Sequence, residues 1–83
     1  MTAHTPEQIE KIVDNILGKL DRAAFNACAV NWGNLRCVEA RRFENGQWYI
    51  LVEDAATDEW RLQKAVRDSL LARGIEAVVH TEW

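Results

Sequence analysis

The feature that most constrains this chain is the segment 35–53, in which two apolar-rich runs flank the tripeptide Glu-Asn-Gly at 44–46. Asparagine and glycine both tolerate positive φ, where a β-branched residue would be strained. An Asn-Gly pair between two apolar runs therefore predicts a β-hairpin. We expect a three-residue loop in which Gly46 takes the left-handed position of a bulge.

The length of this loop decides which residues share a face of the sheet. A two-residue loop would place Ala40 opposite Leu51. A three-residue loop places Ala40 opposite Ile50, and Val38 opposite Val52 two pairs further on. We favour this second register because a slip of one residue would divide the apolar set between core and solvent. The expected core face carries Val38, Ala40, Trp48, Ile50 and Val52. The opposite face carries a mixed set, namely Cys37, Glu39, Arg41, Phe43, Tyr49, Leu51 and Glu53.

An amphipathic helix is expected ahead of the hairpin. Thr5 supplies a hydroxyl cap, a proline follows it at the first helical position, and Gln8 completes a capping box. Because Leu20 and Ala24 prolong the apolar pattern, we expect this helix to end near Phe25. The apolar stripe consists of Ile9, Ile12, Val13, Ile16, Leu17 and Leu20.

A second helix and a third strand are expected after the hairpin. Thr57 can cap the helix, and Gly74 fits the left-handed position just past its end, with Ile75 as the apolar partner of a Schellman motif. The buried side of the helix would hold Leu62, Ala65, Val66, Ser69 and Leu70. From Ile75 to Trp83 the chain alternates as a strand does. One side carries Ile75, Ala77, Val79, Thr81 and Trp83, and the other carries Glu76, Val78, His80 and Glu82.

The elements together predict one domain over residues 1–83, with residues 1–4 as a flexible tail. A chain of this length can bury only just enough apolar surface to offset its lost entropy, so it has no material for a second core. We expect an α+β fold in the order α-β-β-α-β. It would be a two-layer α/β sandwich with a three-stranded sheet and both helices on one face.

Two helices can cover only one face of so small a sheet. Cys37, Phe43, Tyr49, Leu51 and Val78 on the other face would then meet water. Hiding a patch of about 300 Å² would contribute roughly 7 kcal/mol before association entropy is subtracted. Alternatively, flanking charged side chains or the loop 26–34 could shield these residues. We favour a surface that binds a partner.

The four tryptophans of the chain support this interpretation, because tryptophan is enriched in binding hot spots. Trp48 is assigned to the core. Trp32 in a turn, Trp60 in the first turn of the second helix and Trp83 at the end are candidates for recognition. The expected partner-binding residues are Tyr49, Leu51, Phe43, Val78, Trp60, Trp83 and Arg41.

The sequence contains no recognisable catalytic or cofactor-binding constellation. Cys28 and Cys37 match no metal-ligand spacing and are expected to be buried or half-buried free thiols. Glu76 and His80 would offer a cation two ligands without a third. No glycine-rich phosphate loop, nucleophile elbow or Ser/His/Asp set is present. We therefore expect that the protein is not an enzyme, binds no cofactor and has no metal site.

Acidic residues cluster where the second strand meets the second helix, and such carboxylates can hold a divalent ion or act in acid–base chemistry. We favour the interpretation that they complement the dipole of the following helix. A metal site or an active site here would need a pocket joining Asp54 and Asp58 to His80. The cluster consists of Glu53, Asp54, Asp58 and Glu59.

The formal net charge of −3 is too small to imply a nucleic-acid groove. Glutamates interleave the one basic cluster, which consists of Arg36, Arg41 and Arg42, and no aromatic platform accompanies it. Nucleic-acid binding is therefore disfavoured. The sequence shows no signal peptide or membrane-spanning run, so we expect no membrane association and a cytoplasmic location.

Two likenesses suggest alternatives. The order α-β-β-α-β resembles the small carboxy-terminal domain of NifU-type iron–sulfur scaffolds in layout across most of the chain. That family carries a paired CxxC, which this chain lacks, since Cys28 and Cys37 lie nine positions apart. The size, mild acidity and absence of catalytic groups are similar to small phage-encoded inhibitors of bacterial defence, such as anti-CRISPR proteins.

The function expected from the sequence is a non-enzymatic protein-interaction domain of bacterial or phage origin, with a regulatory or inhibitory role. It would dock its open sheet face, edge strand or exposed tryptophans on another protein or on a second copy of itself. Mixed charges around the face would set the register of docking. The alternatives are the phage-type inhibitor and a small metal or iron–sulfur scaffold.

Overall fold

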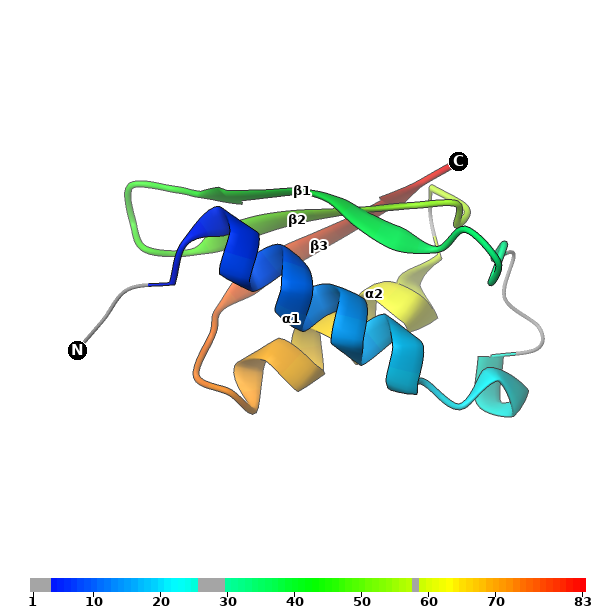
Figure 1. Cartoon of the computed structure of the whole chain (residues 1–83). Coiled ribbons are helices and arrows are strands. Elements are labelled where there is room, and N and C mark those ends of the chain that lie inside the picture. Colours follow the sequence, from blue (N-terminus) through cyan, green and yellow to red (C-terminus); the bar gives the residue numbers. More distant parts are fainter. Residues whose placement is uncertain (1–3, 26–29, 58) are drawn as a thin grey trace.

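Both helices of the chain lie on the same side of its sheet (Figure 1). The computed structural model describes residues 4–25, 30–57 and 59–83. α1 packs against β1, α2 packs against β3, and the two helices contact each other. The predicted two-layer α+β fold in the order α-β-β-α-β is confirmed. In chain order the elements are α1 (Pro6–Lys19), the 3-10 turn η1 (Arg22–Phe25), β1 (Arg36–Arg42), β2 (Trp48–Glu53), α2 (Trp60–Leu71) and β3 (Ala77–Glu82).

The sheet has the order β1-β2-β3, so β2 is central. β1 and β2 pair antiparallel, and β2 and β3 pair parallel. The parallel pair requires a crossover, which α2 provides beneath the sheet (Figure 1). β1 and β3 are therefore the two edges.

The hairpin loop has the predicted geometry. The Gly46 N–H donates to the Phe43 carbonyl at 3.0 Å, and the Phe43 N–H donates to the Gln47 carbonyl at 2.7 Å. Gly46 has φ of +88°, a conformation that glycine adopts without strain. Ala40 lies opposite Ile50, which confirms the predicted register next to the loop.

A β-bulge in β1 changes this register further along. Cys37 pairs with Val52 and Glu39 pairs with Leu51, so Val38 is an extra residue in β1. The prediction that Val38 lies opposite Val52 on the core face is wrong, and so is the placement of Cys37 on the opposite face. The inserted residue reverses the alternation, which turns Cys37 into the core and leaves Val38 half-buried.

The side chain of Asp14 in α1 stabilises the bulge in β1. The Cys37 backbone N–H donates to Oδ1 of Asp14 at 2.9 Å, and the Cys37 thiol donates to the Glu39 carbonyl at 3.4 Å. The first bond joins the helix layer to the strand where the ladder is interrupted. It therefore satisfies a backbone donor that the irregular pairing would otherwise leave without a partner.

α1 begins as predicted and ends earlier. Thr5 Oγ1 accepts from the Gln8 N–H at 3.2 Å, and Gln8 Oε1 accepts from the Thr5 N–H at 2.9 Å, which completes the capping box. The helix ends at Lys19, so the expected end near Phe25 is wrong. Asp21 accounts for the difference, because its carboxylate accepts from the Ala23 N–H at 3.0 Å and starts the separate turn η1.

α2 begins two residues later than expected. Its cap is Glu59, so the predicted cap at Thr57 is wrong. The Ala55 N–H donates to the Glu82 carbonyl at 3.1 Å, which keeps this segment beside the sheet before the helix can start. The end of α2 is as predicted, because Gly74 has φ of +77° and the Ile75 N–H reaches back to the carbonyl of Leu70 at 3.0 Å.

The core between the layers is apolar apart from two buried polar residues, Glu59 and Thr81. Thr81 is fully buried on β3. Its hydroxyl donates to the Ala56 carbonyl and accepts from Gln63 Nε2 at 3.0 Å. The hydroxyl thus joins β3, the segment before α2 and α2 itself. The apolar core consists of Ile9, Val13, Ile16, Leu17, Cys37, Ala40, Trp48, Ile50, Val52, Ala55, Leu62, Val66, Leu70, Ile75, Ala77 and Val79.

We expect Thr81→Val to lower the free energy of unfolding by about 1–3 kcal/mol, because it leaves buried polar groups without their partner while keeping the side chain's shape. Urea unfolding followed by circular dichroism measures this change. Thr57→Val, at an exposed threonine, is the control and should change stability by no more than about 0.5 kcal/mol. Equal stability of Thr81→Val and the unaltered protein would contradict the structural role assigned to the hydroxyl.

Candidate interaction surface

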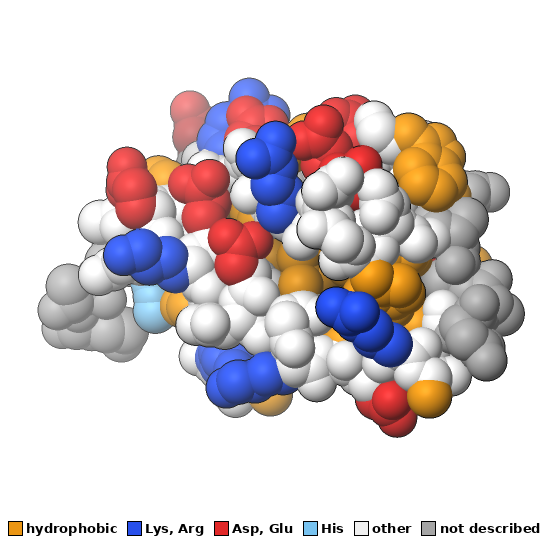
Figure 2. Space-filling view, turned by 45° about the vertical axis from the view of Figure 1, so that its right-hand side comes forward, with side chains coloured by type: hydrophobic (Ala, Val, Ile, Leu, Met, Phe, Trp, Pro, Cys, Tyr) orange, Lys and Arg blue, Asp and Glu red, His pale blue; other side chains and the backbone are white. Residues whose placement is uncertain are grey.

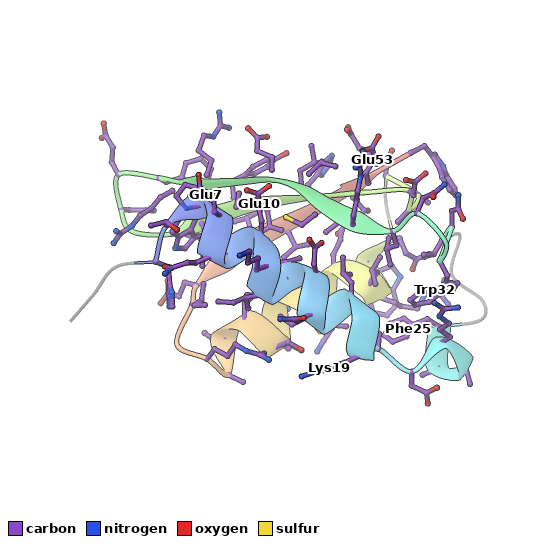
Figure 3. The ribbon with its side chains drawn as sticks, in the orientation of Figure 1. Glu7, Glu10, Lys19, Phe25, Trp32 and Glu53 are labelled. Atoms are coloured by element: carbon purple, nitrogen blue, oxygen red, sulfur yellow. The ribbon has the colours of Figure 1, made fainter. Side chains whose placement is uncertain are left out.

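The face of the sheet turned away from the helices is the open face, and its central residues are Arg41, Tyr49, Leu51, Val78 and His80. Figure 3 shows side chains projecting above the sheet on this side, Glu53 among them. No helix or strand of the described residues lies over them (Figure 1). The open face is therefore uncovered within the part of the chain that the structure describes.

Aromatic and apolar side chains form a row across the open face. The rings of Phe43 and Tyr49 lie 6.2 Å apart between centroids, and the Arg41 guanidinium lies 5.4 Å from the centre of the Tyr49 ring. Phe43 is 38% exposed and Val78 is 45% exposed. Leu51 is half-buried beside them. The row offers an apolar strip with a cation stacked on its aromatic ring, an arrangement frequent in binding surfaces.

Charged side chains surround this row. Arg36 and Glu53 form an ion pair of 3.5 Å between β1 and β2. Glu39 lies opposite Leu51 on one side, and His80 lies opposite it on the other. The face of the molecule in Figure 2 likewise shows acidic and basic side chains interspersed, with apolar groups between them. No continuous acidic face is seen in that view.

The structure divides the expected partner-binding residues between three places. Five of them lie together on the open face: Arg41, Phe43, Tyr49, Leu51 and Val78. Trp60 is 64% exposed at the start of α2, in the helix layer. Trp83 follows β3 and is 65% exposed. Cys37 does not belong to the open face, because the bulge turns it inward.

Trp32 lies at the end of the helix layer. Figure 3 shows it beside Phe25 beyond the end of α1, on the helix side of the sheet. The two rings meet edge to face at 6.3 Å, and the Arg22 guanidinium lies 5.5 Å from the Trp32 ring centre. This half-buried cluster does not cover the open face. Residues 26–29 of the loop, which include Cys28, lie outside the described residues.

Among the described residues of the acidic junction after β2, no pocket joins Asp54 to His80. Asp54 has φ of +71° and lines a shallow cavity of about 480 Å³ that His80 does not line. Glu59 is buried and pairs with Arg61 at 3.0 Å. Asp58 lies outside the described residues. Among those that are described, no three His, Cys, Asp or Glu side chains are grouped as metal ligands would be.

Sequence reasoning did not identify a groove between α2 and the outer edge of β3. We call it the β3 groove; its volume is about 370 Å³. An edge strand packed on a helix could have suggested such a groove, but the sequence does not determine that β3 lies at the edge of the sheet. It is lined by Gln47, Trp60, Gln63, Lys64, Arg67, Ala77, Val78 and Val79.

Cys37 is the one cysteine among the described residues, and the fold buries its side chain. Burial raises the pKa of its thiol from 9.0 to about 12, and the nearby carboxylate of Asp14 adds to the shift. The thiol is therefore protonated at neutral pH and is not a nucleophile. This result confirms the expected buried free thiol at this position.

Comparison with models of protein families, with curated proteins and with solved structures finds no match for this chain. In the described part of the chain, neither helix has both the length and the apolar character needed to cross a bilayer.

We expect the Cys37 thiol to react slowly with a thiol reagent near pH 8, because with a pKa of about 12 only about one thiol in ten thousand is ionised. The measurement uses Cys28→Ser protein, in which Cys37 is the only cysteine. Guanidinium-unfolded protein is the control and should react fast. Labelling of the folded protein as fast as the unfolded protein would contradict the burial of this thiol.

The raised pKa of the Cys37 thiol also predicts that the folded protein loses stability at high pH. Between pH 9.0 and about 12 the unfolded thiol ionises while the folded thiol keeps its proton. The stability that the raised pKa provides is complete below this window and falls as the pH rises through it. In urea unfolding, Cys37→Ala should show a shallower decline of the free energy of unfolding than the parent. Equal slopes would contradict the shift.

Proposed function

We propose that this protein is a small interaction domain without catalytic activity, which docks on another protein or on a second copy of itself through its open face. The observation that supports the proposal is the row of Phe43, Tyr49, Leu51 and Val78, which no described element covers. Burial of such a row against a partner is favourable, because it removes apolar area from water. The neighbouring Arg41, stacked on Tyr49, adds a residue type that is enriched in hot spots.

Charges around the row support a specific rather than a purely apolar contact. Arg41 lies toward one end of the open face, and Glu53 and Glu82 lie together toward the other end. A partner with complementary charges could dock in one register, because like charges opposite each other are unfavourable. We place the protein in the cytoplasm, where a free buried thiol such as Cys37 remains reduced.

We expect Tyr49→Ser combined with Leu51→Ser to weaken association at least about tenfold, since the variant removes two central apolar contacts. Light scattering at two concentrations measures self-association, and pull-down from cells of the source organism detects another partner. Leu71→Ser is the matched control, because Leu71 is 58% exposed on α2, away from the open face.

The melting temperature separates the outcomes of this experiment. The proposal predicts a modest change, because both side chains are only partly buried. A collapse of the melting temperature would show that these residues belong to the core. A folded variant that associates as well as the Leu71→Ser control would also contradict docking through this face.

A further inference from the structure

We propose that the free edge of β3, together with the β3 groove, binds an extended acidic peptide of another protein as an added strand. This site shares Val78 with the open face, but its backbone edge and its α2 side chains do not belong to that face, so the inference does not rest on docking of the open face. Strand addition uses the backbone of an unpaired edge for affinity and neighbouring side chains for specificity. β3 supplies such an edge, and α2 supplies such side chains.

The backbone of β3 is paired on one side. The Trp48 N–H donates to the Glu76 carbonyl at 2.9 Å, and the Ala55 N–H donates to the Glu82 carbonyl at 3.1 Å. Backbone groups alternate in direction along a strand, so those of Ala77 and Val79 point away from β2. No strand of the described residues pairs with them. They are therefore ready donors and acceptors for an incoming strand.

The other edge of the sheet is poorly suited to this role. β1 contains the bulge at Val38 and three arginines, Arg36, Arg41 and Arg42. Bulges and charges are the usual features that prevent strand addition at an edge. The segment 77–79 of β3 is Ala-Val-Val, with no charge, proline or bulge. The two edges therefore differ in their capacity to accept a strand.

The β3 groove gives the edge its specificity. Lys64 and Arg67 of α2 line it, and none of the described acidic residues does. Asp68 neutralises part of this charge, since it pairs with Lys64 at 2.7 Å and with Arg67 at 3.7 Å. The hydrogen bond from Lys64 lowers the pKa of Asp68 below its usual value, so Asp68 stays ionised. These three side chains leave one net positive charge on the α2 side of the edge, which favours acidic side chains on that side of the docked peptide, whereas Glu76 and Glu82 lie on the open-face side of the strand.

An apolar contact completes the site. Trp60 is 64% exposed at one end of the groove, and Val78 is 45% exposed on the other side of the strand. Side chains of an added strand alternate between the two faces of the sheet. One set would reach Lys64, Arg67 and Trp60, and the other would lie beside Val78. The best ligand therefore alternates acidic and apolar residues.

A second copy of this chain fits the edge less well. Antiparallel pairing of two β3 strands centred on Val79 would place Glu76 of each copy opposite Glu82 of the other. Like charges directly opposite each other destabilise a strand pair. The same pairing would bring Lys64 and Arg67 of both copies to one interface. In this register, these repulsions favour a separate acidic peptide as the occupant.

The test is a titration of the isotopically labelled protein with a seven-residue peptide in which glutamate alternates with valine, followed by backbone amide NMR. We expect saturable shifts at Ala77, Val79 and the facing side of α2. Lys64→Glu combined with Arg67→Glu should weaken binding about tenfold or more. Lys11→Glu combined with Arg42→Glu makes the same change in net charge at exposed sites away from the groove, and should leave binding within about twofold.

Two peptide controls test the mode of binding. A peptide with lysine in place of glutamate, and one that is N-methylated at every second residue on its bonding edge, should both bind at least about tenfold more weakly. Equal binding of either control, or shifts confined to other residues, would overturn the proposal. A dimer in which Ala77 and Val79 amides lose their protection on dilution would also overturn it, because a second copy would then occupy the edge.

Discussion

The burial of one sheet face under two helices is the constraint on which the rest of this structure depends. Ile9 and Val13 of α1 and Leu62 and Val66 of α2 are fully buried, and they cover the same side of β2 as Ile50. In the part of the chain that the structure describes, no helix or strand covers the other side. The apolar row of the open face is therefore the feature that calls for a functional explanation.

The bulge at Val38 shows how a local irregularity decides the chemistry of a residue. It places Cys37 against α1, where Asp14 accepts its backbone N–H at 2.9 Å. In a regular strand the same thiol would face solvent beside the arginines of β1. Burial instead raises its pKa to about 12 and removes it from the reactive groups of the surface. The single inserted residue therefore makes Cys37 an unreactive thiol in the core and not an exposed thiol on the surface.

The features that could be predicted are those fixed by neighbouring residues. Thr5 with Gln8, Gly46 and Gly74 each determine a turn or a helix end through their own hydrogen bonds or backbone freedom, and all three were placed correctly. The bulge at Val38 and the late start of α2 depend on contacts with α1 and β3, which lie far away in the sequence. Five candidate surface residues follow from strand alternation alone. Trp60 was placed correctly at the start of the second helix, but the existence of the β3 groove beside it required the order of the strands.

The inequality of the two sheet edges limits what this domain can build. A molecule with two receptive edges can polymerise, because each added strand presents a fresh edge to the next copy. The β1 edge is irregular and rich in arginine, which disfavours such growth, whereas the segment 77–79 of the β3 edge has neither a charge nor a bulge. If a strand adds to β3 as proposed, the sheet can grow in one direction only, so such an assembly would end at this domain and would not continue as a filament.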